Sequence, residues 1–399
     1  MRIGVAVVCI LILMACVGIS GAEEKSGSGA TPSQPLPEPW IVSVSSNYGT
    51  WGAEKFGNSG NQALGFAQLA YDVKTWGVVL TGKYAKTSYK TVLNEDGFEV
   101  STPTDTDISD HYSYTSGDLT LIGGVDISLP TGKHGYSNSE LGRILSESVI
   151  ADLMSLTSYG QGLNVTPHLV IAEKISKDFN VGVGFKYTFS GEYDATTEIA
   201  NDNMKPGDRL SLLLNSVLTA TPNDYIMLTL SYSHAATDKR QGQDVYRAGD
   251  TFSTDFKYIR KWSDAYTSVL GLIVSAQQKN EALNESLILS SENQNSNNNS
   301  CELTLNNNYR LSDKLSLTGI LGYKYVFANG YSMGDALYDS GRWKAYAEPG
   351  MMWIFSHNLY ASVKLRYSRL FDKKDAFEAE DNTYNIYNFD FGLVYNFGL

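Results

Sequence analysis

The feature that most constrains this chain is a regular alternation of apolar and polar residues along many short segments. In the segment 389–399 every odd-numbered residue is apolar or aromatic, and Asp390 lies among the residues between them. The segments 315–327, 181–189 and 119–129 repeat this pattern. Because successive side chains of a β-strand point to opposite faces, a period of two predicts strands with one apolar and one more polar face.

The connections between these segments alternate between short and long. The short ones contain turn residues and lie near 73–74, 117–118, 176–178, 222–224, 263–264, 312–314 and 356–358. The long ones are polar and lie near 51–62, 90–106, 131–160, 194–207, 239–248, 282–299, 329–341 and 373–382. Such asymmetry is typical of transmembrane β-barrels, which have short periplasmic turns and long external loops.

We therefore predict an all-β fold, a transmembrane antiparallel up-and-down β-barrel over residues 40–399. Counting connections gives sixteen strands, and twelve or fourteen stay open because the segments 40–50 and 63–73 alternate poorly and the hairpin at Gly117 is weakly defined. The alternative is a soluble β-sandwich, since its strands alternate as well.

Charged residues support the barrel because they fall on the less apolar face of the strands. A Lys or Arg that faces lipid at the middle of the membrane costs roughly 2–4 kcal/mol, so this face must line the interior of a membrane barrel. Whether these charges set solute selectivity or only pair with one another stays open. The predicted lumen residues are Lys83, Asp126, Lys186, Asp255, Lys257, Lys324, Lys344, Glu348, Lys364, Arg366 and Asp390.

The N-terminal residues predict export. Residues 1–22 combine Arg2, an apolar run and a small-residue cleavage site, which is the pattern of a secretory signal peptide. Residues 23–39 hold four prolines and predict a flexible leader. A second interpretation makes Cys16 the lipidated residue of a lipoprotein signal. In either case the predicted location is the outer membrane of a Gram-negative bacterium.

The connection 131–160 contains apolar residues at helical spacing, which predicts a helical segment in this loop. By position it is the third outward loop, which in general porins folds into the barrel and narrows it. We expect either a gate inside the barrel or a helix packed on its rim. The predicted constriction residues are Leu141, Ile144, Leu145, Val149 and Leu153.

Two motifs carry resemblances to known families. Asp390, Gly392, Tyr395 and Phe397 are spaced like the C-terminal assembly signal of outer-membrane barrels, although two further residues follow the last aromatic.

The motifs at 128–132 (SLPTG), 159–162 (YGQG) and 348–350 (EPG), with Gly117-Asp118, resemble the porin-like transporter family named for the meta-cleavage pathway of phenol degradation. This resemblance implies passage of small hydrophobic or aromatic molecules across the outer membrane.

Other chemistries find little support in the sequence. The formal net charge is −12, whereas nucleic-acid binding favours basic patches. The five histidines are scattered, and Cys301 is the single cysteine beyond the signal segment, so we predict neither a metal site nor a cofactor. No G-x-S-x-G motif is present, and we predict no enzymatic activity.

The resulting prediction is a channel for passive uptake of small solutes. A non-transporting structural or adhesive barrel is the first alternative, and a barrel hydrolase with a site assembled from distant strands is the second. The expected partners are outer-membrane lipid, the barrel assembly machinery and a small-molecule solute, while the oligomeric state stays open.

Overall fold

A computed structural model describes residues 39–55, 57–73, 75–91, 94–137, 140, 149–199, 201–374 and 380–397. The signal peptide, most of the leader and Cys16 lie outside the described residues. The main sheet consists of β1 (Trp40–Ala53), β2 (Ser59–Val73), β3 (Trp76–Thr91), β4 (Asn94–Pro103), β5 (Thr106–Ser116), β6 (Leu119–Leu129), β7 (Asn164–Ser176), β8 (Phe179–Thr188), β11 (Arg209–Thr221), β12 (Asp224–Ala235), β15 (Thr251–Lys261), β16 (Tyr266–Gln277), β19 (Ser300–Arg310), β20 (Leu315–Val326), β21 (Arg342–Ile354), β22 (Leu359–Asp372) and β23 (Asn382–Phe397).

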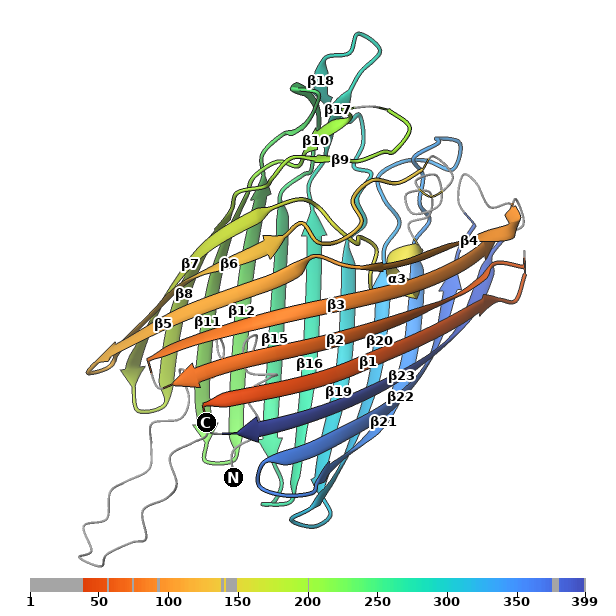
Figure 1. The fold of residues 1–399 in the computed structure, drawn as a ribbon. Coiled ribbons are helices and arrows are strands. Elements are labelled where there is room, and N and C mark those ends of the chain that lie inside the picture. The colour runs from red at the N-terminus through yellow and green to blue at the C-terminus, as the bar shows by residue number, and fades with distance from the viewer. Residues whose placement is uncertain are drawn as a thin grey trace, which may run out of the picture.

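These strands form a closed antiparallel barrel (Figure 1). The last strand returns to the first, with Trp40 opposite Phe397 and Ala53 opposite Tyr384. β4 and β5 both pair with β3 and form one interrupted strand, so the 17 segments of the sheet make a barrel of sixteen strands. The predicted fold class and strand count are confirmed, including the hairpin at Gly117, which has a positive φ of 60°.

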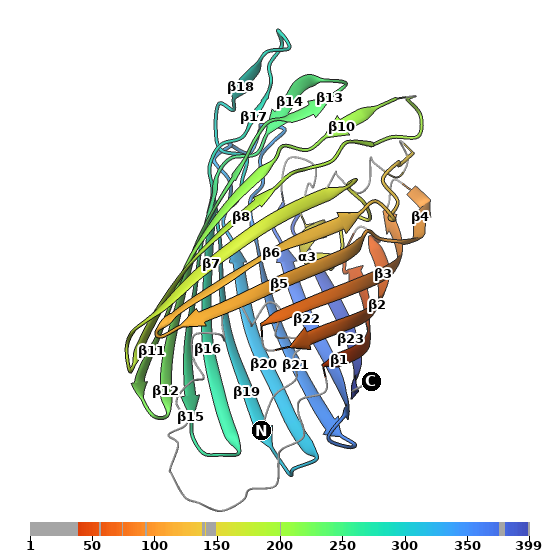
Figure 2. The same cartoon turned by 60° about the vertical axis from the view of Figure 1, so that its left-hand side comes forward.

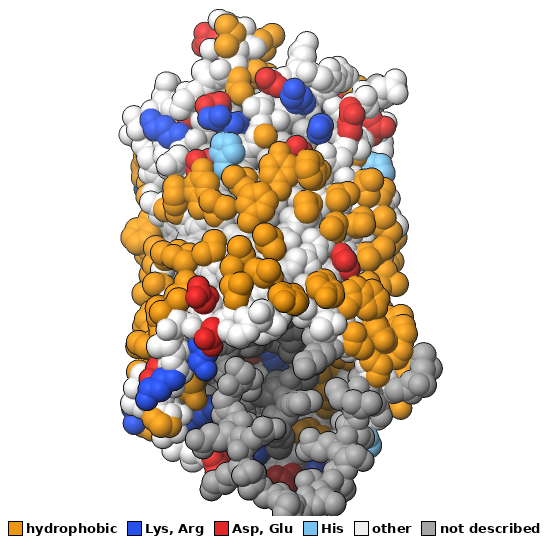
Figure 3. Space-filling view, turned by 90° about the vertical axis from the view of Figure 1, so that its left-hand side faces the viewer, with side chains coloured by type: hydrophobic (Ala, Val, Ile, Leu, Met, Phe, Trp, Pro, Cys, Tyr) orange, Lys and Arg blue, Asp and Glu red, His pale blue; other side chains and the backbone are white. Residues whose placement is uncertain are grey.

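The outward face of the barrel is apolar. Side chains such as Leu80, Phe185, Leu230 and Phe389 are exposed although they are large and hydrophobic. Figure 3 shows hydrophobic side chains as a broad band across one side of the barrel, with charged side chains above and below it. Such a belt exceeds what soluble monomers expose and fits the hydrocarbon of a bilayer. No helix among the described residues is long and apolar enough to cross a membrane.

Two aromatic groups mark the ends of this belt. Trp343 stacks on Phe371 at one end of β21, with ring centroids 5.7 Å apart. Trp76 and Trp262 are exposed at the opposite end of the barrel, beside the short turns. Aromatic side chains at both interfaces are typical of outer-membrane barrels.

A second, smaller sheet is built from the long connections and rises above one mouth of the barrel (Figures 1 and 2). The opposite mouth has the short turns. The six strands of this sheet are β9 (Tyr193–Asp194), β10 (Asn203–Lys205), β13 (Asp238–Arg240), β14 (Gln243–Arg247), β17 (Glu281–Leu283) and β18 (Leu289–Ser291).

The prediction of a long loop at 90–106 is wrong, because most of this stretch forms strand β4. Thr81 lies opposite Asp107 while Tyr84 lies opposite Pro103, so the outer strand carries one extra residue near Thr104. A bulge of one residue moves the following side chains to the other face. The parity of alternation therefore changes within this strand, and the sequence pattern is lost.

The poor alternation of β1 and β2 has a packing cause. Trp51 and Leu64 point into the barrel and are buried there, although residues on this face are polar elsewhere. Trp51 packs with Val149 and Leu153, and Leu64 packs with Tyr159. Along this part of the wall, the inward side chains therefore contact a loop that folds into the barrel, and not water.

Candidate functional site

The connection between β6 and β7 folds into the barrel. Its short helix α3 (Ile150–Leu153) lies inside the ring of strands (Figures 1 and 2). Val149 and Leu153, two of the predicted constriction residues, are buried against Trp51 of β1 and Leu370 of β22. The other predicted constriction residues, Leu141, Ile144 and Leu145, lie outside the described residues.

A buried carboxylate ties α3 to the opposite strands. Asp152 accepts hydrogen bonds from Arg342 Nε at 2.6 Å and from Lys324 Nζ at 2.5 Å. Its backbone carbonyl accepts one from Lys344 Nζ at 2.7 Å. Burial alone would raise the pKa of Asp152, but the charges of Arg342 and Lys324 outweigh burial and hold it below its usual value.

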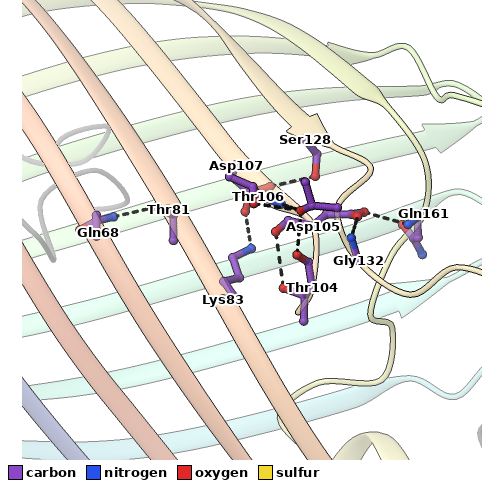
Figure 4. Close-up of polar contacts among 11 residues, drawn as sticks. Gln68, Thr81, Lys83, Thr104, Asp105, Thr106, Asp107, Ser128, Gly132 and Gln161 are labelled. Carbon is purple, nitrogen blue, oxygen red and sulfur yellow. Dashed lines mark hydrogen bonds and ion pairs between the residues drawn. The ribbon is translucent and has the colours of Figure 1, made fainter. Parts of the chain in front are cut away.

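A second contact fastens both ends of the loop at the bulge between β4 and β5. Asp105 Oδ1 accepts from the backbone N–H of Gly132 at 3.0 Å, and Oδ2 accepts from that of Gln161 at 2.8 Å (Figure 4). The backbone N–H of Asp105 donates to the carbonyl of Tyr159. A Cβ at residue 132 would collide with that carbonyl, so glycine is needed for this approach.

These contacts of Asp105 with Gly132, Gln161 and Tyr159, here called the Asp105 clasp, bring together the 128–132 and 159–162 motifs that carry the family resemblance. Beside it, Lys83 pairs with Asp107, which also accepts from Ser128 Oγ at 2.8 Å (Figure 4). Deeper in the loop, Tyr159 donates to Thr87 Oγ1 at 2.5 Å. The loop is therefore held by polar contacts at its base and by apolar packing along its length.

The eleven predicted lumen residues all lie on the inward face, opposite in parity to the exposed apolar residues of their strands. All eleven have an inward partner. The pairs are Lys83–Asp107, Lys186–Asp126, Lys257–Asp255, Lys324–Asp152, Lys364–Glu348 and Arg366–Glu348, while Asp390 accepts from Asn47 and Lys344 donates to the carbonyl of Asp152.

These pairs are not sealed in a solid core. The side chain of Lys186 points inward and is 50% exposed, and Asp126, its partner at 3.1 Å, is 34% exposed. An inward charge can be exposed to this degree only if water fills the space beside it, since burying a charge in a dry interior is costly. The barrel interior therefore contains a wet lumen.

A cavity of about 380 Å³ opens in the lumen wall, on the strands that face away from the loop. Its lining combines apolar side chains such as Ile122, Val170 and Leu213 with the polar side chains of His111, Asp126, His168 and Lys186. The cavity has room at this point because Gly184 lacks a side chain. A Cβ there would lie 3.3 Å from Leu213 Cβ and 3.6 Å from Val170 Cγ2. The size suits a small-molecule ligand.

Ser109, Asp126 and His168 meet at this cavity, but not in the order of a hydrolytic triad. The hydroxyl of Ser109 donates to Asp126 Oδ1. Nδ1 of His168 lies 3.7 Å from Asp126 Oδ2, and no described contact places an imidazole on the serine. A serine that donates to a carboxylate is not activated as in the Ser–His–Asp arrangement, in which histidine accepts its proton.

Three important residues escaped the sequence analysis. Arg342 has the same parity as the predicted Lys344, so extending the alternation by one pair finds it. Asp152 is an acidic residue on the apolar face of the expected helix. Asp105 gave no signal, because the bulge removes it from any regular pattern. Within the described residues, no group of three or more His, Cys, Asp or Glu side chains could hold a metal ion.

The predicted assembly signal lies on the closing strand β23. Asp390 and Gly392 face the lumen, and Tyr395 faces outward and is exposed. The ring of Phe397 stacks on that of Trp40 of β1, with centroids 6.3 Å apart. Recognition of these residues by the assembly machinery stays a prediction.

No family model and no curated protein matches the sequence. Among solved structures, the chain is similar to a CymD monoaromatic hydrocarbon channel, with 11% identity over 91% of this chain and 90% of that chain and a TM-score of 0.44. It is similar to a Pseudomonas aeruginosa FadL homologue at 10% identity, 90% of each chain and a TM-score of 0.44. A bacterial polysaccharide outer membrane secretin gives 8% identity, 91% and 100% coverage and a TM-score of 0.47. Likeness at this level carries no functional argument, and the assignment as a transmembrane β-barrel rests on the strand pairing and the outward apolar belt.

Proposed function

We propose that this protein is a channel of the Gram-negative outer membrane through which small solutes, apolar or aromatic compounds among them, enter by diffusion. The observation that carries the proposal is the exposure of inward charges such as Lys186 inside a closed barrel. A barrel that served only as a scaffold could fill its interior with side chains, whereas sixteen strands enclose enough space for an aqueous passage.

The proposed passage runs beside the inward loop. The described contacts of residues 149–159 are with the wall from β20 through β23 to β1 and on to the bulge between β4 and β5. The 380 Å³ cavity lies on β5 to β12. At the level of the loop, solutes would therefore pass along the β5–β12 wall, which offers apolar surface together with hydrogen-bonding groups.

Conductance of the purified full-length protein in planar lipid bilayers tests this proposal. We expect stepwise current increases as single barrels insert, and faster entry of a small aromatic compound into liposomes that contain the protein. A folded barrel that inserts but passes neither ions nor the aromatic compound would refute the proposal. Heat-dependent mobility in gel electrophoresis separates folded from unfolded protein in both assays.

Location and partners are part of the proposal. Fractionation should find the protein with outer-membrane lipid, and depletion of the barrel assembly machinery should lower its folded amount. The aromatic Phe397 next to the closing seam supports recognition by that machinery. A protein recovered from the periplasm without detergent would contradict the membrane assignment.

An adhesive role is a second candidate, favoured by the sheet above the mouth. Its β17–β18 hairpin exposes Leu287 and Ile288 to solvent. Deleting residues 281–291 should leave conductance unchanged and should reduce attachment of cells to surfaces only if this candidate is correct.

A further inference from the structure

The lumen wall on β20–β22 carries ion pairs in which the acid is buried and the base is exposed. Glu348 is 3% exposed, whereas its partners Lys364 and Arg366 are 44% and 35% exposed. Asp152 is 4% exposed, whereas its partner Lys324 is 29% exposed. Glu348 belongs to β21 and Asp152 to α3, and each carboxylate is almost closed to water while its cationic partner stays exposed.

We propose that this wall, here called the cationic wall (Lys324, Lys364 and Arg366), makes the channel selective for anions and that its solutes include small organic anions. This inference rests on the proposed channel function and names the charge of the solute. The eleven inward charges alone indicate mixed sign, so the selectivity comes from the unequal exposure within each pair.

The other acids near the cationic wall are each engaged by a donor group of the protein. Asp339 is 13% exposed and lies 3.2 Å from Arg342 Nη1. Glu302 accepts from the hydroxyl of Tyr346 at 2.7 Å, and Asp390 accepts from the amide of Asn47 at 2.6 Å. A solute that approaches this wall therefore meets exposed ammonium and guanidinium groups, whereas each of these carboxylates already accepts from a donor of the protein.

Contacts with Glu348 and Tyr346 also hold the cationic groups in place. The guanidinium of Arg366 donates to Glu348 Oε2 at 2.6 Å and lies 4.8 Å from the ring of Tyr346. Lys364 Nζ lies 3.5 Å from Glu348 Oε1, so its ammonium keeps donors free for a solute. Charged rings and ladders of this kind select ions by sign in other pores.

On the opposite wall, the acidic and basic side chains of each pair are exposed to more similar degrees. Lys186 and Asp126 are 50% and 34% exposed, and Lys83 and Asp107 are 30% and 39% exposed. Both signs meet the water there, so that wall discriminates weakly.

Reversal potentials in a salt gradient test the proposal. For the purified full-length protein in a planar bilayer with a KCl gradient, we expect chloride to permeate about twofold or more better than potassium. When benzoate replaces chloride, a current carried by the anion should remain. When benzylammonium replaces potassium, it should carry less current than potassium does. Lys364→Gln should shift the reversal potential toward the potassium value, because it removes the most exposed side chain of the cationic wall.

The variants distinguish selectivity from folding. Glu348→Gln, which removes a buried acid and keeps its shape, should increase the preference for chloride. Lys177→Gln, in a turn outside the lumen, should change nothing. Cation preference of the unaltered channel, or an unchanged reversal potential in folded Lys364→Gln, would overturn the proposal while leaving the channel function intact. Absence of any conductance would overturn both.

Discussion

Asp152 and Arg342 stand 190 residues apart in the sequence and are joined by a hydrogen bond of 2.6 Å inside the barrel. The pair links the inward loop to the first residue of β21 and is buried on both sides. Because Lys324 and Lys344 donate to the same residue, α3 is held at three points across two strands. Asp152 is therefore the polar anchor of α3, in addition to the Asp105 contacts at the base of the loop and the apolar packing along it.

Removing the charge of Asp152 should widen the passage. In Asp152→Asn the buried Arg342 loses one acidic partner while Asp339 and Asp372 remain near it, and loss of one partner of a buried pair typically costs about 3–5 kcal/mol. We expect larger and noisier single-channel currents, measured in planar bilayers. Asp313→Asn, in a short turn at the far mouth, is the control. Currents identical to those of the unaltered protein would show that the loop does not restrict the passage.

The pH dependence of the current should follow the lowered pKa of Asp152. A carboxyl whose pKa is lower in the folded state contributes stability above the unfolded-state pKa, about 3.9 for Asp, and loses it as the pH falls through the folded-state pKa. Currents at pH 5 should therefore equal those at pH 7 and increase only below about pH 4. An increase between pH 7 and pH 5 would mean that another group holds the loop.

Loss of the Asp105 clasp should free the base of the loop. Each hydrogen bond to a charged group contributes roughly 1.5–3 kcal/mol, and Asp105→Ala removes two of them. We expect faster cleavage within residues 133–158 by an added protease, read out by mass spectrometry. Asp105→Asn keeps one acceptor and should fall between the two proteins. Equal cleavage of all three would exclude a role for the clasp.

Filling the wall cavity should slow apolar solutes more than ions. Gly184→Leu places a side chain where Leu213 and Val170 already confine a Cβ, so it must extend into the cavity. Liposome entry of a small aromatic compound should fall about three- to tenfold because the cavity supplies its apolar contact area. Gly319→Leu, at an outward position with open space, is the control. A parallel fall in ion current would indicate misfolding or blockage of the whole lumen.

How much of this molecule the sequence could predict depends on the range of the interaction. Alternation is local, so it was sufficient for the barrel, for sixteen strands and for the inward parity of residues such as Lys186 and Glu348. It failed at β4, where one extra residue near Thr104 reverses the parity. The partners of Asp152 could not be predicted, since they lie on strands that are distant in sequence and adjacent only after the barrel closes.

Thiol labelling along β8 tests most directly the claim that hydrocarbon meets one face of each strand and water meets the other. In a protein with Cys301 replaced by Ser, single cysteines at 183, 184, 185 and 186 would be exposed in outer-membrane vesicles to a charged, membrane-impermeant thiol reagent. Val183 and Phe185 face outward and are exposed in the isolated barrel, while Gly184 and Lys186 line the cavity. We predict labelling at 184 and 186 and protection at 183 and 185. Equal labelling at all four positions, or labelling of 183 and 185 alone, would contradict the account.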